Sequence, residues 1–150
     1  MEAASSSPIP APPKSSHPVD VGLRTEAAIL AGLVRRGYNV LVPFGTNQRY
    51  DLVLDIDGEF VRAQCKTGRL RGGVVVFSTR SVRTNSRRTF LRDYTTKEVE
   101  LFLVHCPETG AIYAVPVADA PAGHGYLRVD ATKNGQQQGI RWARDYELPA

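Results

Sequence analysis

The sequence has little of what disulfide-rich or zinc-binding proteins are built from. Its 150 residues include two cysteines, Cys65 and Cys106, and three histidines that show none of the spacings of metal ligands. We therefore expect no histidine-based metal centre. Both cysteines fall in apolar segments, so we predict buried free thiols, with a disulfide or a metal site as the alternative.

Long hydrophobic runs and a secretory signal are also missing. No apolar segment approaches the roughly 20 residues of a membrane span, so we expect a protein of the cytoplasm with no membrane partner. Residues 1–18 hold five of the ten prolines, with many serines and alanines and no apolar period. We predict that this segment is a disordered tail and that residues 19–150 form one domain.

Acidic residues are absent between Thr67 and Arg92, a stretch rich in arginine. The remainder of the chain has 12 basic and 15 acidic residues, so all the basic excess lies here. Such concentrated charge suggests the phosphate backbone of DNA as a partner, and a solvated surface loop is the alternative. The candidate DNA-binding residues are Arg69, Arg71, Arg80, Arg83, Arg87, Arg88 and Arg92.

The strongest local pattern is a hairpin from Tyr50 to Thr67. Asp57-Gly58 between two alternating apolar runs predicts a type I′ turn, because glycine tolerates a positive φ. The residue numbers of each cross-strand pair then sum to 115, which places Asp51 opposite Gln64. Lys66 falls on the same face as Gln64. The other face is predicted to be core and carries Leu52, Leu54, Ile56, Val61, Ala63 and Cys65.

A helix is predicted before this hairpin, capped by Asp20 and running to about Arg36, with Gly37 ending it. Glu26 falls inside the apolar arc of this helix, where a carboxylate is costly unless it is paired or bound to a cation. It either pairs with a base such as Lys66 or points toward the site of Asp51. The predicted arc comprises Leu23, Ala27, Ile29, Leu30, Leu33 and Val34.

The rest of the chain favours strands. We predict strands at 38–42, 74–78, 101–105, 112–117 and 126–129, and a final helical turn at 141–146. Gly72-Gly73 marks a tight bend. Residues 80–95 show no clear period and are predicted to form a mobile basic loop. One helix followed by several strands indicates a mixed α+β layer.

The residues at the hairpin favour hard-cation chemistry. No serine or cysteine lies in a visible pairing with histidine, so nucleophilic catalysis is not indicated, and Gly72-Gly73 lacks the lysine of a phosphate-binding loop. Mg²⁺ is usually held by one or two carboxylates together with water and substrate phosphate. Asp51 offers a carboxylate, Gln64 a carbonyl oxygen, and Cys65 its main-chain carbonyl. Lys66 could orient a water or offset charge on the phosphate.

Tyr50-Asp51 followed by Gln64-Cys65-Lys66, after a helix that carries Glu26, resembles the PD-(D/E)XK nuclease motif. The likeness is to the glutamine-bearing branch, which includes small group I intron homing endonucleases. It extends over roughly residues 20–148 and includes these further segments: Gly37-Tyr38-Asn39-Val40, Tyr113-Ala114-Val115-Pro116-Val117, Asn134-Gly135-Gln136-Gln137 and Ile140-Arg141-Trp142-Ala143.

This resemblance implies a restriction-endonuclease-like fold, with an N-terminal helix packed on a central mixed β-sheet. It implies that Asp51 is the main metal ligand, that Lys66 is the catalytic lysine and that Glu26 binds the metal directly or through water. Gln64 occupies the second acidic position, and its lost charge should weaken metal binding. Tyr50 replaces the proline of the motif, which supplies no ligand. The implied cofactor is Mg²⁺, for which Mn²⁺ would substitute.

Three functions are compatible with these residues. The first is a Mg²⁺-dependent endonuclease that hydrolyses double-stranded DNA, which would act as a homodimer or higher oligomer because cutting two strands normally needs two active sites. The second is a DNA-binding module that kept the fold but lost turnover. The third is a structural protein in which Asp51, Lys66 and Glu26 form a buried salt-bridge network.

Overall fold

The computed structural model describes residues 7–150, apart from the side chains of residues 83 and 84. The expected disordered tail, residues 1–18, thus lies partly outside the described residues. Residues 7–17 contain no helix or strand, and disorder there stays a prediction. The part of the chain that is described contains no helix long and apolar enough to cross a membrane.

One α-helix and ten strands make up the described chain, with two short 3-10 helices. The helices are α1 (Pro18–Arg35), η1 (Val117–Asp119) and η2 (Ala143–Asp145). The first five strands are β1 (Asn39–Leu41), β2 (Leu52–Ile56), β3 (Glu59–Thr67), β4 (Arg69–Arg71) and β5 (Val74–Ser78). The others are β6 (Arg80–Thr84), β7 (Thr89–Asp93), β8 (Leu101–His105), β9 (Ile112–Pro116) and β10 (His124–Arg128).

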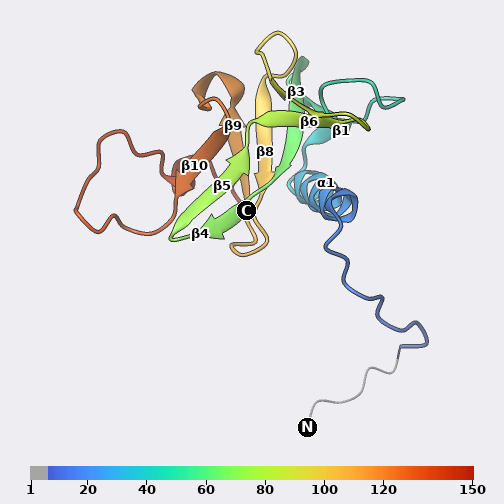
Figure 1. The fold of residues 1–150 in the computed structure, drawn as a ribbon, viewed down its shortest axis with the longest axis horizontal. Coiled ribbons are helices and arrows are strands. Elements are labelled where there is room, and N and C mark those ends of the chain that lie inside the picture. The colour runs from blue at the N-terminus through green and yellow to red at the C-terminus, as the bar shows by residue number, and fades with distance from the viewer. Residues whose placement is uncertain (1–6) are drawn as a thin grey trace.

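A five-stranded mixed sheet forms the centre of the molecule. Its strand order is β1-β2-β3-β8-β9, in which only β3 and β8 are parallel. A three-stranded sheet, β10-β5-β4, lies beside it, and β6 and β7 form a separate two-stranded ribbon. Figure 1 shows these layers with α1 seen nearly end-on. The predicted α+β class, one helix against a central mixed sheet, is confirmed.

Two hydrophobic cores lie on the two faces of the central sheet. Between α1 and the sheet lie Ile29, Leu33, Leu52, Leu54, Ala63, Leu103 and Ile112. The other core includes Phe102 and Val104 of β8, Val75 and Phe77 of β5, and Leu127 of β10. Both cysteines are free, as predicted, with Cys106 buried and Cys65 half-buried.

The hairpin forms as predicted. Strands β2 and β3 pair in the register that sums to 115, from Leu52 with Ala63 to Ile56 with Glu59. Asp57 and Gly58 have φ angles of 54° and 84°, as a type I′ turn requires. Ile56, predicted to lie in the core, is instead 42% exposed, because it occupies the last rung beside the turn.

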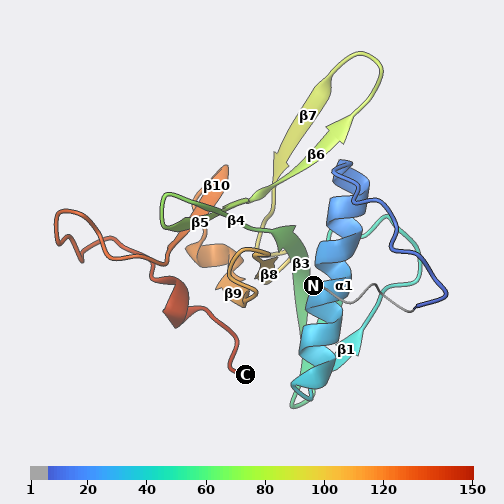
Figure 2. The same cartoon turned by 90° about the horizontal axis from the view of Figure 1, so that it is seen from below.

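Helix α1 lies along the central sheet (Figure 2), but it is rotated from the predicted arc. Its buried residues are Thr25, Ile29, Gly32 and Leu33, whereas Leu23 and Val34 of the predicted arc are 60% and 58% exposed. A side chain at Gly32 would overlap that of Ile112 in β9. The missing side chain thus lets the helix approach the sheet on this face.

The ends of α1 also differ slightly from the prediction. The helix begins at Pro18, and the capping residue is His17 rather than Asp20: the side chain of His17 accepts a hydrogen bond from the main-chain nitrogen of Val19. Asp20 lies inside the first turn, where its charge suits the helix dipole. Gly37 follows the helix with a φ of 86°, as predicted.

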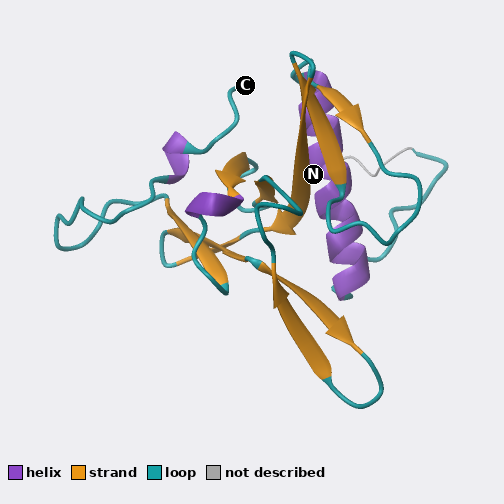
Figure 3. Ribbon diagram, turned by 90° about the horizontal axis from the view of Figure 1, so that it is seen from above, coloured by secondary structure: helices purple, strands orange, loops and turns teal. Residues whose placement is uncertain are grey.

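The predicted loop at 80–95 is wrong, because most of these residues form the β6–β7 ribbon. Its five pairs run from Arg80 with Asp93 to Thr84 with Thr89. Figure 3 shows the ribbon projecting from the rest of the molecule. Val82 and Leu91 on its strands are 64% and 60% exposed. Since neither face is buried, the sequence carries no alternating pattern to reveal the strands.

Candidate metal and nucleic-acid site

Asp51 is held at the start of β2 by the main chain of β3. Its main-chain nitrogen donates to the carbonyl of Ala63 at 2.9 Å, and its Oδ2 accepts a hydrogen bond from the main-chain nitrogen of Cys65, also at 2.9 Å. Burial raises the pKa of Asp51, while this hydrogen bond and the charge of Lys66 act in the opposite direction. The carboxylate is thus oriented by backbone groups.

Glu26 of α1 lines the same cavity as Asp51. The cavity has a volume of about 220 Å³, and its other lining comes from the loop that leads to the hairpin. Burial and then the charge of Asp51 raise the pKa of Glu26. Glu26 therefore lies toward Asp51, one of the two orientations considered from the sequence. A carboxylate whose pKa is raised by the charge of a second carboxylate favours a cation near the two.

Lys66 lies next to Asp51 but makes no ion pair with either acid in the described part of the chain. Its Nζ donates to the main-chain carbonyl of Arg80 at 2.7 Å and lies 4.8 Å from the ring centroid of Tyr94. Burial lowers the pKa of Lys66 to about 8, Asp51 opposes this shift and Arg49 adds to it. The buried salt-bridge network of Asp51, Lys66 and Glu26 is therefore not formed.

Gln64, predicted as a second ligand, is half-buried on β3 beside Phe102 of β8. Its carboxamide makes no hydrogen bond with any residue that the structure describes, so no contact fixes it toward Asp51. The neighbouring thiol of Cys65 faces α1. Burial and the charges of Asp51 and Glu26 raise the pKa of this thiol, which keeps it protonated. The role of the Cys65 main-chain carbonyl as a ligand stays a prediction.

Arg49 is a central residue of this site that the sequence did not single out. Its guanidinium donates to Ser81 Oγ at 2.5 Å and to the carbonyl of Asp93 at 2.8 Å. It also lies 3.0 Å from Glu98 Oε2 and 4.1 Å from the ring centroid of Tyr94. Arg49 thus joins the base of the β6–β7 ribbon to the ring that contacts the lysine. These partners lie 32 or more residues away along the chain, and no local pattern indicates them.

The seven arginines form two groups rather than one. Arg69 and Arg71 lie on β4, and the other five lie on the ribbon or its turn. Two of those five have acidic partners beyond the acid-free stretch: Arg80 pairs with Asp93 at 2.7 Å and Arg92 with Glu98 at 3.0 Å.

The remaining ribbon arginines have different surroundings. The guanidinium of Arg88 lies 4.3 Å from the ring centroid of Phe90, and Arg87 is exposed in the turn. The side chain of Arg83 lies outside the described residues. The exposed part of the ribbon therefore remains basic.

The candidate donors at this cavity are oxygen atoms, which suit a hard divalent cation. No group of three or more histidine, cysteine, aspartate or glutamate side chains in the described residues could hold a metal. Asp51 and Glu26 supply two carboxylates to one cavity. Mg²⁺ commonly needs no more than this, because water and substrate phosphate complete its coordination.

Comparison with known proteins agrees with this architecture. The family model described as PD-(D/E)XK endonuclease matches residues 16–149. The chain belongs to the PD-(D/E)XK endonuclease family. A comparison with curated protein sequences gave no match.

Among solved structures, the chain is similar to I-Ssp6803I, a bacterial homing endonuclease. The two share 24% sequence identity with a TM-score of 0.70, and the match covers 88% of this chain and 89% of that chain. This likeness concerns the fold, and it confirms the restriction-endonuclease-like architecture that the motif implied.

Proposed function

We propose that the protein is a Mg²⁺-dependent endonuclease that hydrolyses phosphodiester bonds of double-stranded DNA in the cytoplasm. The observation that carries this proposal is the arrangement of Glu26 and Asp51 in one cavity, with half-buried Lys66 beside them. Membership of an endonuclease family supports the same reaction. The basic β6–β7 ribbon next to the site supports nucleic acid as the substrate.

Asp51 would be the main ligand of the ion, with Glu26 binding it directly or through water. Gln64 and the carbonyl of Cys65 are further candidates. When bound, the ion would polarise the scissile phosphate and lower the pKa of an attacking water. The hydrogen bond from the main-chain nitrogen of Cys65 keeps Asp51 Oδ2 oriented, so the site needs little rearrangement to take the ion. Mn²⁺, which also accepts oxygen ligands, should substitute.

Lys66 would stabilise the negative charge that develops on the phosphate. Its Nζ is held by the Arg80 carbonyl, which fixes the ammonium group. A pKa of about 8 leaves most of this side chain protonated at pH 7. In a partly buried site such a preorganised positive charge is worth more than it is in water.

The β6–β7 ribbon would contact the DNA. A two-stranded ribbon fits the major groove of B-form DNA, and this ribbon projects beside β3, the strand that carries Lys66 (Figure 2). Arg83, Arg87, Arg88 and Arg92 would bind phosphates or guanine edges, and Arg80 would act at the base of the ribbon. Arg69 and Arg71 on β4 would contact a different part of the duplex.

Two copies of the site are needed to cut both strands of a duplex. We therefore propose a homodimer or a higher homo-oligomer as the active form. Sedimentation of the purified chain with and without DNA would measure this directly.

A second candidate function is a DNA-binding module without turnover. The observation that favours it is Gln64, which leaves the site one carboxylate short of the family motif. Such a module would bind duplex DNA in gel-shift experiments but would cleave nothing in Mg²⁺ or Mn²⁺.

The test is cleavage of supercoiled plasmid by the purified protein in Mg²⁺, with Asp51→Ala and Lys66→Ala as inactive variants. We expect nicked and linear products from the wild type and none from either variant or in chelator. Cleavage that persists in both variants would mean that the active site lies elsewhere.

A further inference from the structure

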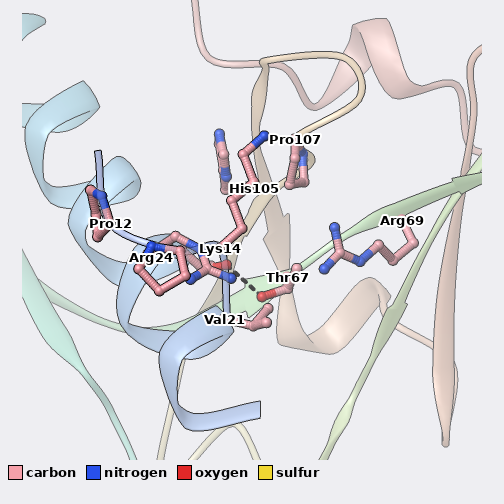
Figure 4. Close-up of a pocket in the computed structure, with 10 residues that line it drawn as sticks. Pro12, Lys14, Val21, Arg24, Thr67, Arg69, His105 and Pro107 are labelled. Atoms are coloured by element: carbon pink, nitrogen blue, oxygen red, sulfur yellow. Dashed lines mark hydrogen bonds between the residues drawn. The ribbon is translucent and has the colours of Figure 1, made fainter. Parts of the chain in front are cut away.

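A second cavity, which is lined by basic residues, lies on α1, apart from the cavity of Glu26 and Asp51. It has a volume of about 590 Å³ and opens between residues 12–14, the first turns of α1, and the ends of the parallel strands β3 and β8. Figure 4 shows Arg24 on the helix side of Thr67 and Arg69 on the strand side.

The cavity is lined by positive charge. Lys14, Arg24 and Arg69 contribute cationic groups and His105 an imidazole, and no acidic side chain lines it. Burial lowers the pKa of His105, so its neutral ring can donate or accept a hydrogen bond at pH 7. Such a lining suits an anionic ligand that also carries neutral polar groups.

These cations are not neutralised by carboxylates. None of Lys14, Arg24 and Arg69 makes an ion pair within the described part of the chain, and Arg24 donates to the neutral carbonyl of Ser15 at 2.6 Å. Glu108, which lies beyond the lining, interacts with one of them, Arg69. Its pKa is lowered, against the effect of burial, by hydrogen bonds and by the charge of Arg69. The cavity therefore keeps a net attraction for anions.

This cavity and the proposed metal site use neighbouring residues of α1 and β3. Thr25 and Thr67, whose hydroxyl groups lie 2.5 Å apart, line the cavity. Thr25 directly precedes Glu26, and Thr67 directly follows Lys66. Successive residues of a strand point to opposite faces, so Thr67 faces Thr25 of α1 while Lys66 faces the base of the β6–β7 ribbon. The two sites thus open on opposite faces of the same end of β3, and a DNA strand that passes around this end would contact both.

We propose that this cavity binds a phosphate and its sugar from the DNA strand next to the cleaved bond. The proposal rests on the proposed function, because it needs a strand to pass Asp51. Arg24 and Arg69 would hold the phosphate from two sides, and His105 would contact the sugar or a phosphate oxygen. The cavity would thereby fix the position of the strand relative to Lys66.

The test is the salt dependence of duplex binding, measured by fluorescence anisotropy in chelator for Arg24→Gln, Arg69→Gln and the double variant. Because both arginines would hold the same phosphate, the double variant should lose that contact and its slope of log K against log salt should fall by about 1, with a smaller reduction in each single variant. Arg35→Gln is the matched control, because Arg35 is exposed at the opposite end of the same helix. Thermal unfolding shows whether each variant is folded.

The outcomes separate this proposal from the proposed function. Slopes that match the wild type in folded Arg24→Gln and Arg69→Gln would overturn the cavity proposal and leave the nuclease proposal intact. A wild type without salt-dependent DNA binding would overturn both. A titration with 5′-deoxyadenosine monophosphate tests whether the ligand is a free nucleotide instead. It is, if the wild type binds this nucleotide, the double variant does not, and the salt slope of DNA binding by the double variant matches that of the wild type. That result would also overturn the assignment to a DNA strand.

Discussion

At the scale of single residues, the site is defined by charges that the protein leaves uncompensated. Glu26 and Asp51 share a cavity, and burial raises the pKa of each. Their charged forms therefore destabilise the fold at neutral pH, and this cost disappears as the pH falls through their folded-state pKa values. A bound cation would remove the same cost without protonation.

Asp51→Asn should remove both the destabilisation caused by the charge of Asp51 and the increase in stability on adding metal. The amide oxygen keeps the hydrogen bond from Cys65, so the backbone should not move. In chelator we expect a melting temperature about 2–4 °C above that of the wild type, which is the shift for about 1 kcal/mol in a chain of this size. Adding Mg²⁺ should raise the melting temperatures of the wild type and of a variant that keeps the site, but not that of Asp51→Asn. The exposed turn variant Asp57→Asn is the control, and a normal Mg²⁺ response in Asp51→Asn would contradict the site.

Lys66 gives a prediction for stability against pH. Its pKa is about 8 in the fold against 10.5 for a fully solvated lysine, so between these values the unfolded chain binds a proton that the folded chain does not. The free energy of unfolding should therefore rise with pH across this window. Each pKa unit corresponds to about 1.4 kcal/mol, so the total increase due to Lys66 should be roughly 3 kcal/mol.

Urea unfolding in chelator at pH 7 to 10.5 measures this effect. The free energy of unfolding of the wild type should rise relative to that of Lys66→Met as the pH increases. The exposed Lys97→Met serves as the control, and its difference from the wild type should stay constant. Parallel curves for Lys66→Met and the wild type would show that Lys66 is not buried as the structure has it.

The relative positions of the candidate site residues were predictable from the sequence where they depend on short-range geometry. The hairpin register placed Asp51 near Lys66, and the helical period singled out Glu26. Arg49 and Tyr94 were missed, because their contacts depend on how the ribbon packs against the central sheet. The environment of Gln64 was equally hidden, since its neighbour Phe102 comes from a strand 38 positions later.

At the scale of elements, the β6–β7 ribbon depends on one side chain at its base. Arg49 binds Ser81 Oγ of β6 and the Asp93 carbonyl of β7. In Arg49→Gln these contacts are lost, and the amides of the ribbon should exchange with solvent about tenfold faster, which corresponds to about 1.4 kcal/mol. Hydrogen exchange measured by mass spectrometry tests this, with exposed Arg144→Gln as the control. Unchanged exchange in the ribbon would contradict the bracing role.

Two glycines in different elements should respond to alanine with opposite signs. A side chain at Gly125 in β10 would overlap the ring of Phe77 in β5, whereas Gly22 in α1 has no atom within 4 Å of an added Cβ. We expect Gly125→Ala to lose about 1–3 kcal/mol and Gly22→Ala to gain up to about 1 kcal/mol. Urea unfolding measures both. A stable Gly125→Ala would mean that the two strands pack less closely than described.

Elements were predictable in proportion to how strongly one of their faces is buried. Strands β2, β3, β5 and β8 have clear apolar patterns, and their positions were predicted within a residue or two. The ribbon was mistaken for a loop, because both of its faces meet solvent. The rotation of α1 was also missed, since the deciding feature is the space left by Gly32 against Ile112.

At the scale of the whole molecule, the parallel pairing of β3 with β8 organises the two sites. It brings Thr67 beside His105, so the cavity lined by basic residues opens at the ends of these two strands. Lys66, one residue earlier, lies beside Asp51 and the ribbon. One end of the central sheet therefore carries the carboxylates, the lysine and two sources of positive charge. This grouping is what a nuclease needs to hold a DNA strand over a metal ion.

The most direct test of this account is the single-turnover cleavage rate of a labelled DNA duplex in Mg²⁺. The account predicts cleavage by the wild type and by Asp57→Asn at similar rates, and no cleavage in chelator. Asp51→Asn should bind the duplex at least as tightly as the wild type, but its cleavage rate should be at least about 100-fold lower. The reason is that stabilisation of the transition state by a metal ion is worth several kcal/mol. Cleavage by Asp51→Asn at the wild-type rate, or by the wild type in chelator, would contradict the account.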